Sequence, residues 1–179
     1  MIARVLSSPA EERLDTPRER FLLPDGRLAF RRLLRAFAAF WHEHGEVLAS
    51  GMPYPEVAPQ LVLMAFLQRA INVGNGGGFI DREYGVGRGR IDLLVRFPYR
   101  KSDGSPAVQR RALELKVWCK GQKDPLREGL VQLDDYLARL RQRRGTLVIF
   151  DARGRLARSA PRFSEAATPR GRRVAVLRL

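Results

Sequence analysis

Gly89-Arg-Ile-Asp-Leu-Leu-Val95 and Ala112-Leu-Glu-Leu-Lys-Val-Trp118 are two short segments in which aliphatic residues alternate with charged ones. Alternation of this kind predicts β-strands. Because side chains on a strand repeat every second residue, Glu114 and Lys116 are expected on one face, about 7 Å apart at their bases. Residues 98–106, between the two segments, are rich in turn formers. They predict that the strands fold back on each other as a hairpin.

The predicted hairpin would bring two carboxylates together, Asp92 from the first strand and Glu114 from the second. Two carboxylates, a backbone carbonyl and water molecules form a ligand set suited to Mg²⁺. Such an ion polarises a phosphoryl oxygen and lowers the pKa of an attacking water. Lys116 beside it could orient that water or neutralise charge on the phosphate. The pattern therefore predicts metal-assisted phosphodiester hydrolysis, with Mg²⁺ or Mn²⁺ as the cofactor.

The same residues also admit structural interpretations. Asp92 could be a surface or turn-capping aspartate, and Glu114 with Lys116 could be an exposed pair worth at most about 1 kcal/mol. However, Leu94 shares the face of Asp92, and Trp118 continues the apolar second strand, as is typical of a central strand buried on both faces. Ionised groups in such a place need partners or a metal. A buried structural salt bridge therefore stays an alternative to a metal site.

An amphipathic helix is predicted downstream of the second strand. Its apolar stripe has spacings of four and three residues and consists of Leu126, Leu130, Leu133, Leu137 and Leu140. Gln132 and Tyr136 lie four residues apart at the edge of this stripe, where they could face the strand that carries Glu114 and Lys116. The alternative for both is an ordinary position on the flank of a helix.

Three segments together resemble a known family. Asp92 followed by Glu114-Leu-Lys116 resembles the signature of the PD-(D/E)XK nuclease superfamily, an acid on one strand and acid-x-Lys on the next. More narrowly, Gly87-Arg-Gly-Arg-Ile-Asp-Leu-Leu94, Glu114-Leu-Lys-Val-Trp118 and Gly129-Leu-Val-Gln-Leu-Asp-Asp-Tyr136 look like the nuclease-like domain at the C-terminus of many prokaryotic AAA-type ATPases. The resemblance runs from about residue 52 to residue 151.

The resemblance implies a restriction-endonuclease-like α/β/α sandwich with a central mixed sheet, an αβββαβ core preceded by N-terminal helices. It implies a DNA endonuclease in which Asp92 and Glu114 bind the metal, Lys116 assists the water and Gln132 is auxiliary. An AAA-type ATPase partner and a homodimer are left open.

An accessory metal ligand is harder to assign. In many superfamily members an acid from the first core helix completes the site, but the helix predicted at 57–72 contains no carboxylate. Glu83, on a strand predicted at 79–85 that also carries Asp81, is the substitute ligand proposed from the sequence. A solvated strand face is the alternative for this pair.

The net charge is the second strong signal. The chain carries 33 Lys and Arg residues against 19 Asp and Glu residues, a formal net charge of +14. A domain this basic is suited to a polyanion, and we expect DNA binding that weakens steeply with salt. The candidate phosphate contacts are Arg88, Arg90, Lys120, Lys123, Arg139 and Arg143. A solvated basic face is the alternative for these residues.

The chain of 179 residues is expected to form one domain. Residues 1–27 are predicted to be an N-terminal extension, and residues 28–179 the nuclease-like domain. Within it we expect helices over 28–72, the catalytic core over 78–151, and a C-terminal tail with a last, edge strand over 152–179. The single cysteine excludes a disulfide framework, and no segment approaches the roughly 20 apolar residues of a membrane helix. A cytoplasmic protein without membrane contact is therefore expected.

A metal-dependent DNA endonuclease is thus the first functional hypothesis. The chain has no phosphate-binding loop of the ATPase type. A non-catalytic nucleic-acid-binding or AAA-ATPase-associated module, or a docking domain of a larger complex, is the alternative.

Overall fold

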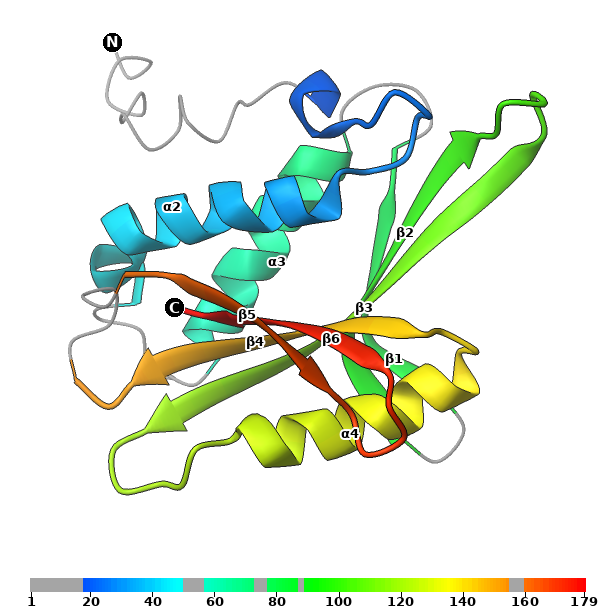
Figure 1. The fold of residues 1–179 in the computed structure, drawn as a ribbon. Coiled ribbons are helices and arrows are strands. Elements are labelled where there is room, and N and C mark those ends of the chain that lie inside the picture. Colours follow the sequence, from blue (N-terminus) through cyan, green and yellow to red (C-terminus); the bar gives the residue numbers. More distant parts are fainter. Residues whose placement is uncertain (1–17, 50–56, 73–76, 87–88, 155–159) are drawn as a thin grey trace, which may run out of the picture.

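A computed structural model describes residues 18–49, 57–72, 77–86, 89–154 and 160–179. They form a six-stranded mixed sheet with the strand order β1-β2-β3-β4-β6-β5 (Figure 1). The strands are β1 (Phe79–Val86), β2 (Gly89–Arg100), β3 (Pro106–Cys119), β4 (Arg144–Ala152), β5 (Arg162–Ala167) and β6 (Arg173–Arg178). Among the described residues, no helix is long and apolar enough to cross a membrane.

Helices cover both faces of the sheet. The long helix α2 (Phe30–Ala49) and helix α3 (Ala58–Ile71) lie on one face, and α4 (Leu126–Arg139) lies on the other (Figure 1). A short 3₁₀ helix, η1 (Arg18–Phe21), precedes α2. The mixed α/β class and the predicted order of helix, three strands, helix and strand are confirmed.

The strand directions follow from the connections. β1, β2 and β3 are consecutive in the chain and form an antiparallel meander. β3 and β4 are parallel, since α4 carries the chain back across the sheet before β4 begins. The predicted hairpin is confirmed with a shorter turn than expected. Both strands extend into the Pro-containing segment, and only residues 101–105 form the loop, closed by a hydrogen bond from Lys101 N to Ser105 O (2.9 Å).

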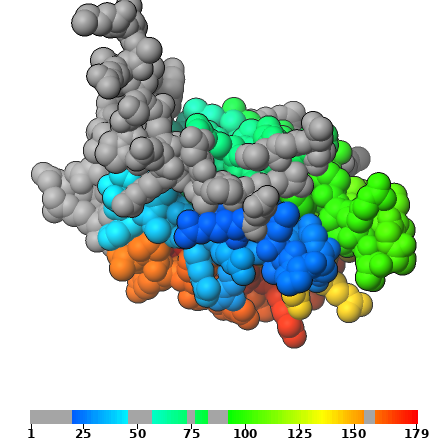
Figure 2. Space-filling view, turned by 90° about the horizontal axis from the view of Figure 1, so that it is seen from above, coloured from blue at the N-terminus to red at the C-terminus, as the bar shows by residue number. Residues whose placement is uncertain are grey.

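The prediction that the last strand lies at a sheet edge is wrong. β6 lies between β4, to which it is parallel, and β5, to which it is antiparallel. The sequence reading missed β5, which is only partly buried along its length and so lacks a strong apolar alternation. β5 takes the edge position. In the space-filling view, the orange and red C-terminal residues lie beside the blue and cyan residues of η1 and α2 (Figure 2).

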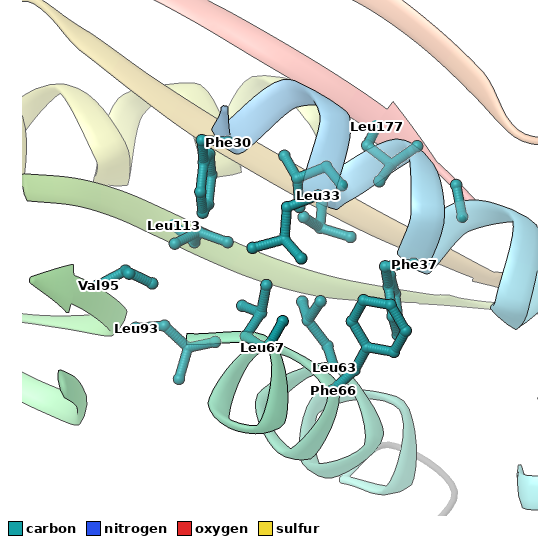
Figure 3. Packing of buried hydrophobic residues seen from close by; sticks show 14 of the residues in the cluster. Phe30, Leu33, Phe37, Leu63, Phe66, Leu67, Leu93, Val95, Leu113 and Leu177 are labelled. Carbon is teal, nitrogen blue, oxygen red and sulfur yellow. The ribbon is translucent and has the colours of Figure 1, made fainter. Parts of the chain in front are cut away.

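Two apolar layers hold the helices on the sheet. Alternation on β3 and β4 sends Leu113 and Val148 to the layer under α2 and α3, and Leu147 and Ile149 to the layer under α4. Phe37 from α2 and the apolar side of α3 pack against the first group (Figure 3). Each fully buried Leu or Phe contributes roughly 1.5–3 kcal/mol.

The close approach of α4 to the sheet depends on a glycine. A Cβ atom added to Gly129 would lie 2.7 Å from Leu147 Cδ1, far inside van der Waals contact. Gly129 therefore lets α4 pack directly on β4, which brings the side chains of its first two turns near β3.

The part of the predicted N-terminal extension that the structure describes, residues 18–27, packs against the domain. Phe21 is buried in the first apolar layer, and Leu28 follows it there. Gln109 of β3, also buried, accepts a hydrogen bond from Leu28 N (2.8 Å) and donates one to Leu28 O (3.1 Å). This side chain therefore mimics a neighbouring strand for the backbone of Leu28.

We expect Gln109→Ala to lower the free energy of unfolding by roughly 3 kcal/mol, because it leaves a buried N–H and a buried C=O of Leu28 without partners. Urea denaturation monitored by circular dichroism measures the change. Gln142→Ala is the matched control, since the Gln142 side chain makes no hydrogen bond to the described part of the chain. Equal midpoints for the two variants would contradict the role given to Gln109.

Candidate metal and catalytic site

The site forms where β2 and β3 separate. The two strands pair from Arg100↔Pro106 up to Leu93↔Leu113, and the pairing stops there. Beyond this point β2 pairs only with β1, and β3 only with β4. We call the point where the pairing of β2 with β3 stops the fork. Asp92 is the first residue of β2 beyond it. Its Oδ2 accepts a hydrogen bond from Leu115 N (2.7 Å), so the carboxylate occupies the position that a strand carbonyl would otherwise take.

A cavity of about 390 Å³ lies at this fork. The four predicted catalytic residues line it together, which is what the hairpin and the helix were expected to achieve. Its lining residues are Gln60, Asp92, Glu114, Leu115, Lys116, Val117, Gln122, Gln132 and Tyr136. Strand β3 and two helices, α3 on one face of the sheet and α4 on the other, therefore contribute side chains to the cavity that Asp92 lines.

Glu114 is the most perturbed group of the cavity. Its side chain is 5% exposed, Oε1 lies 3.5 Å from Lys116 Nζ, and the buried Oε2 has no hydrogen-bond partner. Burial, and then the charge of Asp92, raise the pKa of Glu114 to about 8, although Lys116 opposes the shift. At neutral pH the carboxyl is therefore mostly protonated unless a further cation balances the two acids.

Lys116 is held in place by three oxygen atoms. Its Nζ donates to Gln132 Oε1 (2.5 Å) and to Glu128 Oε1 (2.9 Å), and it lies 3.5 Å from Glu114 Oε1. Burial alone would lower the pKa of Lys116, but the hydrogen bond to Glu128 and the charges of Glu114 and Glu128 raise it overall. The result is a positioned, charged ammonium group beside two acids.

Three polar residues of the site were not predicted from the sequence: Gln60, Gln122 and Glu128. Gln60, in the first turn of α3, lines the cavity and also a small void of about 40 Å³ next to Asp92. Gln60 is a polar residue among the apolar residues of α3, and this pattern is the sequence signal that could have identified it. Glu128 was overlooked as well, although its spacing of four from Gln132 places both on one side of α4.

Asp81, one of the two acids predicted near the metal, does not line the described cavity. The side chain of Glu83 lies outside the described residues, so the structure does not place it. Asp81 forms an ion pair with Arg96, with Nε 2.7 Å from Oδ2. Asp134 and Asp135 of the third family segment point away from the fork. Asp134 accepts hydrogen bonds from Thr168 and Arg172, which fix the β5–β6 turn on α4.

The predicted phosphate contacts are spread over the surface. Arg88 lies outside the described residues, as does the side chain of Arg90. Lys120 and Lys123 are exposed on the turn after β3, close in sequence to the cavity residue Gln122. Arg139 is exposed at the end of α4, and Arg143 just before β4. Among the side chains of this set that the structure describes, the two lysines are the closest in sequence to a residue that lines the cavity.

The donor atoms at the fork suit a hard divalent cation better than zinc. Asp92 and Glu114 offer carboxylate oxygens and Gln60 an amide oxygen, whereas zinc prefers histidine and cysteine. No group of three or more His, Cys, Asp or Glu side chains is present in the described ranges. The buried Oε2 of Glu114, which lacks a partner beside a second acid, is the kind of atom that such a cation would satisfy.

Comparison with known proteins adds no relative: no family model, no curated protein and no solved structure matches this chain. The chemistry of the site therefore has to be argued from its own residues.

Proposed function

We propose that this protein is a Mg²⁺- or Mn²⁺-dependent DNA endonuclease of the PD-(D/E)XK superfamily, with a restriction-endonuclease-like sandwich fold. The observation that carries the proposal is the pair of acids at the fork. Glu114 is buried with one unpartnered oxygen, its pKa is raised by burial and by Asp92, and Lys116 lies beside it. A surface salt bridge would not need such a costly arrangement.

Each residue has a defined role in this proposal. Asp92 and Glu114 would hold the cation, with Gln60 as a neutral third oxygen donor. A bound cation supplies charge stabilisation to the phosphate and lowers the pKa of water. Lys116 would orient the attacking water and place a positive charge beside the phosphate oxygens. Gln132 and Glu128 keep the ammonium group in that position.

The polyanionic substrate is supported by charge. The formal net charge of +14 offsets the repulsion between two carboxylates and a phosphodiester backbone. Lys120 and Lys123 are exposed on the turn after β3 and flank the cavity residue Gln122 in the sequence, so they are candidates for phosphate contacts.

Cleavage of supercoiled, linear and single-stranded DNA by the purified protein tests the proposal. We expect products with Mg²⁺ or Mn²⁺ and none with EDTA, and we expect Asp92→Asn to be inactive and to bind Mn²⁺ more weakly in calorimetry. Because Asp92→Asn retains an oxygen that can accept the Leu115 N–H, its melting temperature should stay near that of the wild type. Unchanged Mn²⁺ affinity in this variant would show that the metal site is wrongly assigned.

One observation favours a second candidate, a non-catalytic nucleic-acid-binding or AAA-ATPase-associated module. Lys116 already contacts three oxygens and Asp92 already accepts the Leu115 N–H, so the cluster also has the character of a structural network. Salt-sensitive DNA binding without cleavage under any metal condition would favour this candidate. Copurification with an ATPase subunit would then identify the partner.

A further inference from the structure

Three arginines lie side by side on neighbouring strands of the sheet. They lie on the sheet face opposite to Glu114, and at the other end of the strands from the acidic site. Arg144 of β4 pairs directly with Arg173 of β6. Arg111 of β3 lies two residues before Leu113, whose partner Thr146 lies two residues after Arg144. All three share the sheet face of Leu113, under α2, whereas Glu114 and Lys116 face the opposite way. Neighbouring strands are about 4.8 Å apart, so three positive charges are stacked in register.

These arginines line the cavity of about 530 Å³ between the start of α2 and the sheet. Arg31 and Arg35 of α2 complete its basic rim, and Phe30 and Phe163 contribute aromatic surface. Arg31 also lies over the Phe163 ring, with Cζ 5.9 Å from the ring centre. The cavity thus combines converging positive charges with an aromatic ring of intermediate exposure at its side.

The charges of this cavity are not balanced within the described part of the chain. Arg111, Arg144 and Arg173 form no ion pair there, and the buried Nε of Arg111 has no hydrogen-bond partner. The acid on the rim, Glu165, pairs with Arg31 at 3.5 Å. Burial, and then the charges of Arg27 and Arg144, lower the pKa of Arg111. Arg144 and Arg173 are exposed and Arg111 is partly buried. Like charges on neighbouring strands destabilise a sheet, so a bound anion would stabilise this arrangement.

The basic surface continues past this cavity. Arg144 and Arg173 also line a second cavity of about 580 Å³, together with Arg143. Arg170 and Arg172 border it too but are paired with Asp134. A ligand seated on Arg144 and Arg173 could therefore place one phosphate in each cavity, which favours a chain of phosphates over a single one.

We propose that this surface, the Arg111–Arg144–Arg173 groove, binds the phosphates of a single-stranded nucleic acid. Stacking of a base on an aromatic side chain beside a basic track is the usual chemistry of single-strand binding, and Phe163 offers such a ring. A base can stack on Phe163 only when it is unpaired, which favours a single strand over a duplex. Binding here needs no metal and does not depend on the proposed cleavage, because the groove lies on the other face of the sheet.

Fluorescence anisotropy with a labelled dT12 oligonucleotide in EDTA tests the groove on the full chain. We expect Arg144→Gln to weaken binding about tenfold, as for the loss of a charged hydrogen bond. The slope of log affinity against log salt should fall by about 0.7, the share of one phosphate contact on a single strand. Arg110→Gln is the matched control, since it removes the same charge from an exposed neighbour on the opposite face of β3, and it should change the affinity less than twofold.

The outcomes separate the possibilities. Equal losses in Arg144→Gln and Arg110→Gln would mean that only the overall charge matters and would overturn the groove. The protein could instead bind a free nucleoside triphosphate and not dT12, with this binding lost in Arg144→Gln and kept in Arg110→Gln. That result would overturn the proposal of a single-stranded nucleic acid and identify a mononucleotide as the ligand. Arg144→Gln removes one of several like charges, so its melting temperature should not fall below that of the wild type. Arg173→Gln repeats the binding test at the neighbouring position. The measurement is made in EDTA and needs no cleavage, so failure of the nuclease proposal leaves this result unaffected.

Discussion

Lys116→Met will lower the rate of DNA cleavage by about 100- to 1000-fold while the affinity for Mn²⁺ stays within a few-fold of the wild type. The methionine side chain fills similar space but carries no charge, so Glu114 and Asp92 keep their positions and lose only the ammonium group. Removing the charge takes away the group that would orient the water and stabilise the phosphate. Initial cleavage rates and Mn²⁺ calorimetry, measured on the same preparations, separate the two effects.

Glu114→Gln is the contrasting variant. We expect it to lose cleavage to at least the same extent and also to bind Mn²⁺ more weakly, since it removes one of two anionic ligands. Lys101→Met, in the exposed turn between β2 and β3, is the control for the loss of a lysine charge and should cleave at nearly the wild-type rate. If Lys116→Met and Lys101→Met cleave equally well, Lys116 has no catalytic role. That result would favour the second candidate, in which Lys116 belongs to a structural network.

Local sequence patterns were enough to predict that Asp92, Glu114 and Gln132 lie close together. Alternation in the segments around Asp92 and Glu114 determined which residues share a face, and the turn residues between them determined that the strands pair as a hairpin. The four- and three-residue spacing of leucines then placed Gln132 on the side of α4 that faces β3. Each inference used residues close in sequence, where the geometry of a strand or a helix fixes the outcome.

The features that escaped prediction depend on contacts between distant segments. Gln60 reaches the fork only because α3 packs across β1 and β2. Arg111, Arg144 and Arg173 become neighbours only through two strand registers, and nothing in the local sequence of β6 indicates that it pairs with β4. The edge prediction for β6 failed for the same reason, because the weakly alternating β5 had to be recognised first.

The second large effect concerns stability in the absence of metal. We expect the free energy of unfolding in EDTA to fall by up to about 5 kcal/mol as the pH rises from about 4.5 to 8. The pKa of Glu114 is about 8 in the folded protein against 4.5 in its ordinary state, because burial and Asp92 disfavour the carboxylate. Between these values the folded state binds the extra proton, so the stabilisation is complete below the lower pKa and is lost as the pH rises through the higher one.

Carboxylates with lowered pKa values change the stability in the opposite direction and over a more acidic pH range. For Asp134, burial opposes the shift, but hydrogen bonds from Thr168 and Arg172 lower the pKa overall. The stabilisation from that group is present above its ordinary pKa and is lost as the solution becomes more acidic. Urea titrations between pH 5 and pH 8 therefore report mainly on Glu114, and the difference between wild type and Glu114→Gln isolates its contribution.

A divalent cation should remove this dependence in the wild type. If Asp92 and Glu114 share the ion, saturating Mn²⁺ keeps Glu114 ionised, stabilises the protein by about 2.7 kcal/mol at 100 times the dissociation constant, and releases a proton on binding at neutral pH. The released proton appears as a binding enthalpy that changes with the ionisation enthalpy of the buffer. Glu114→Gln has no proton to release, so its weaker binding should be independent of the buffer. A buffer-independent enthalpy in the wild type would mean that the ion binds elsewhere, because no cation can bind between the two acids without displacing the proton that burial places on Glu114.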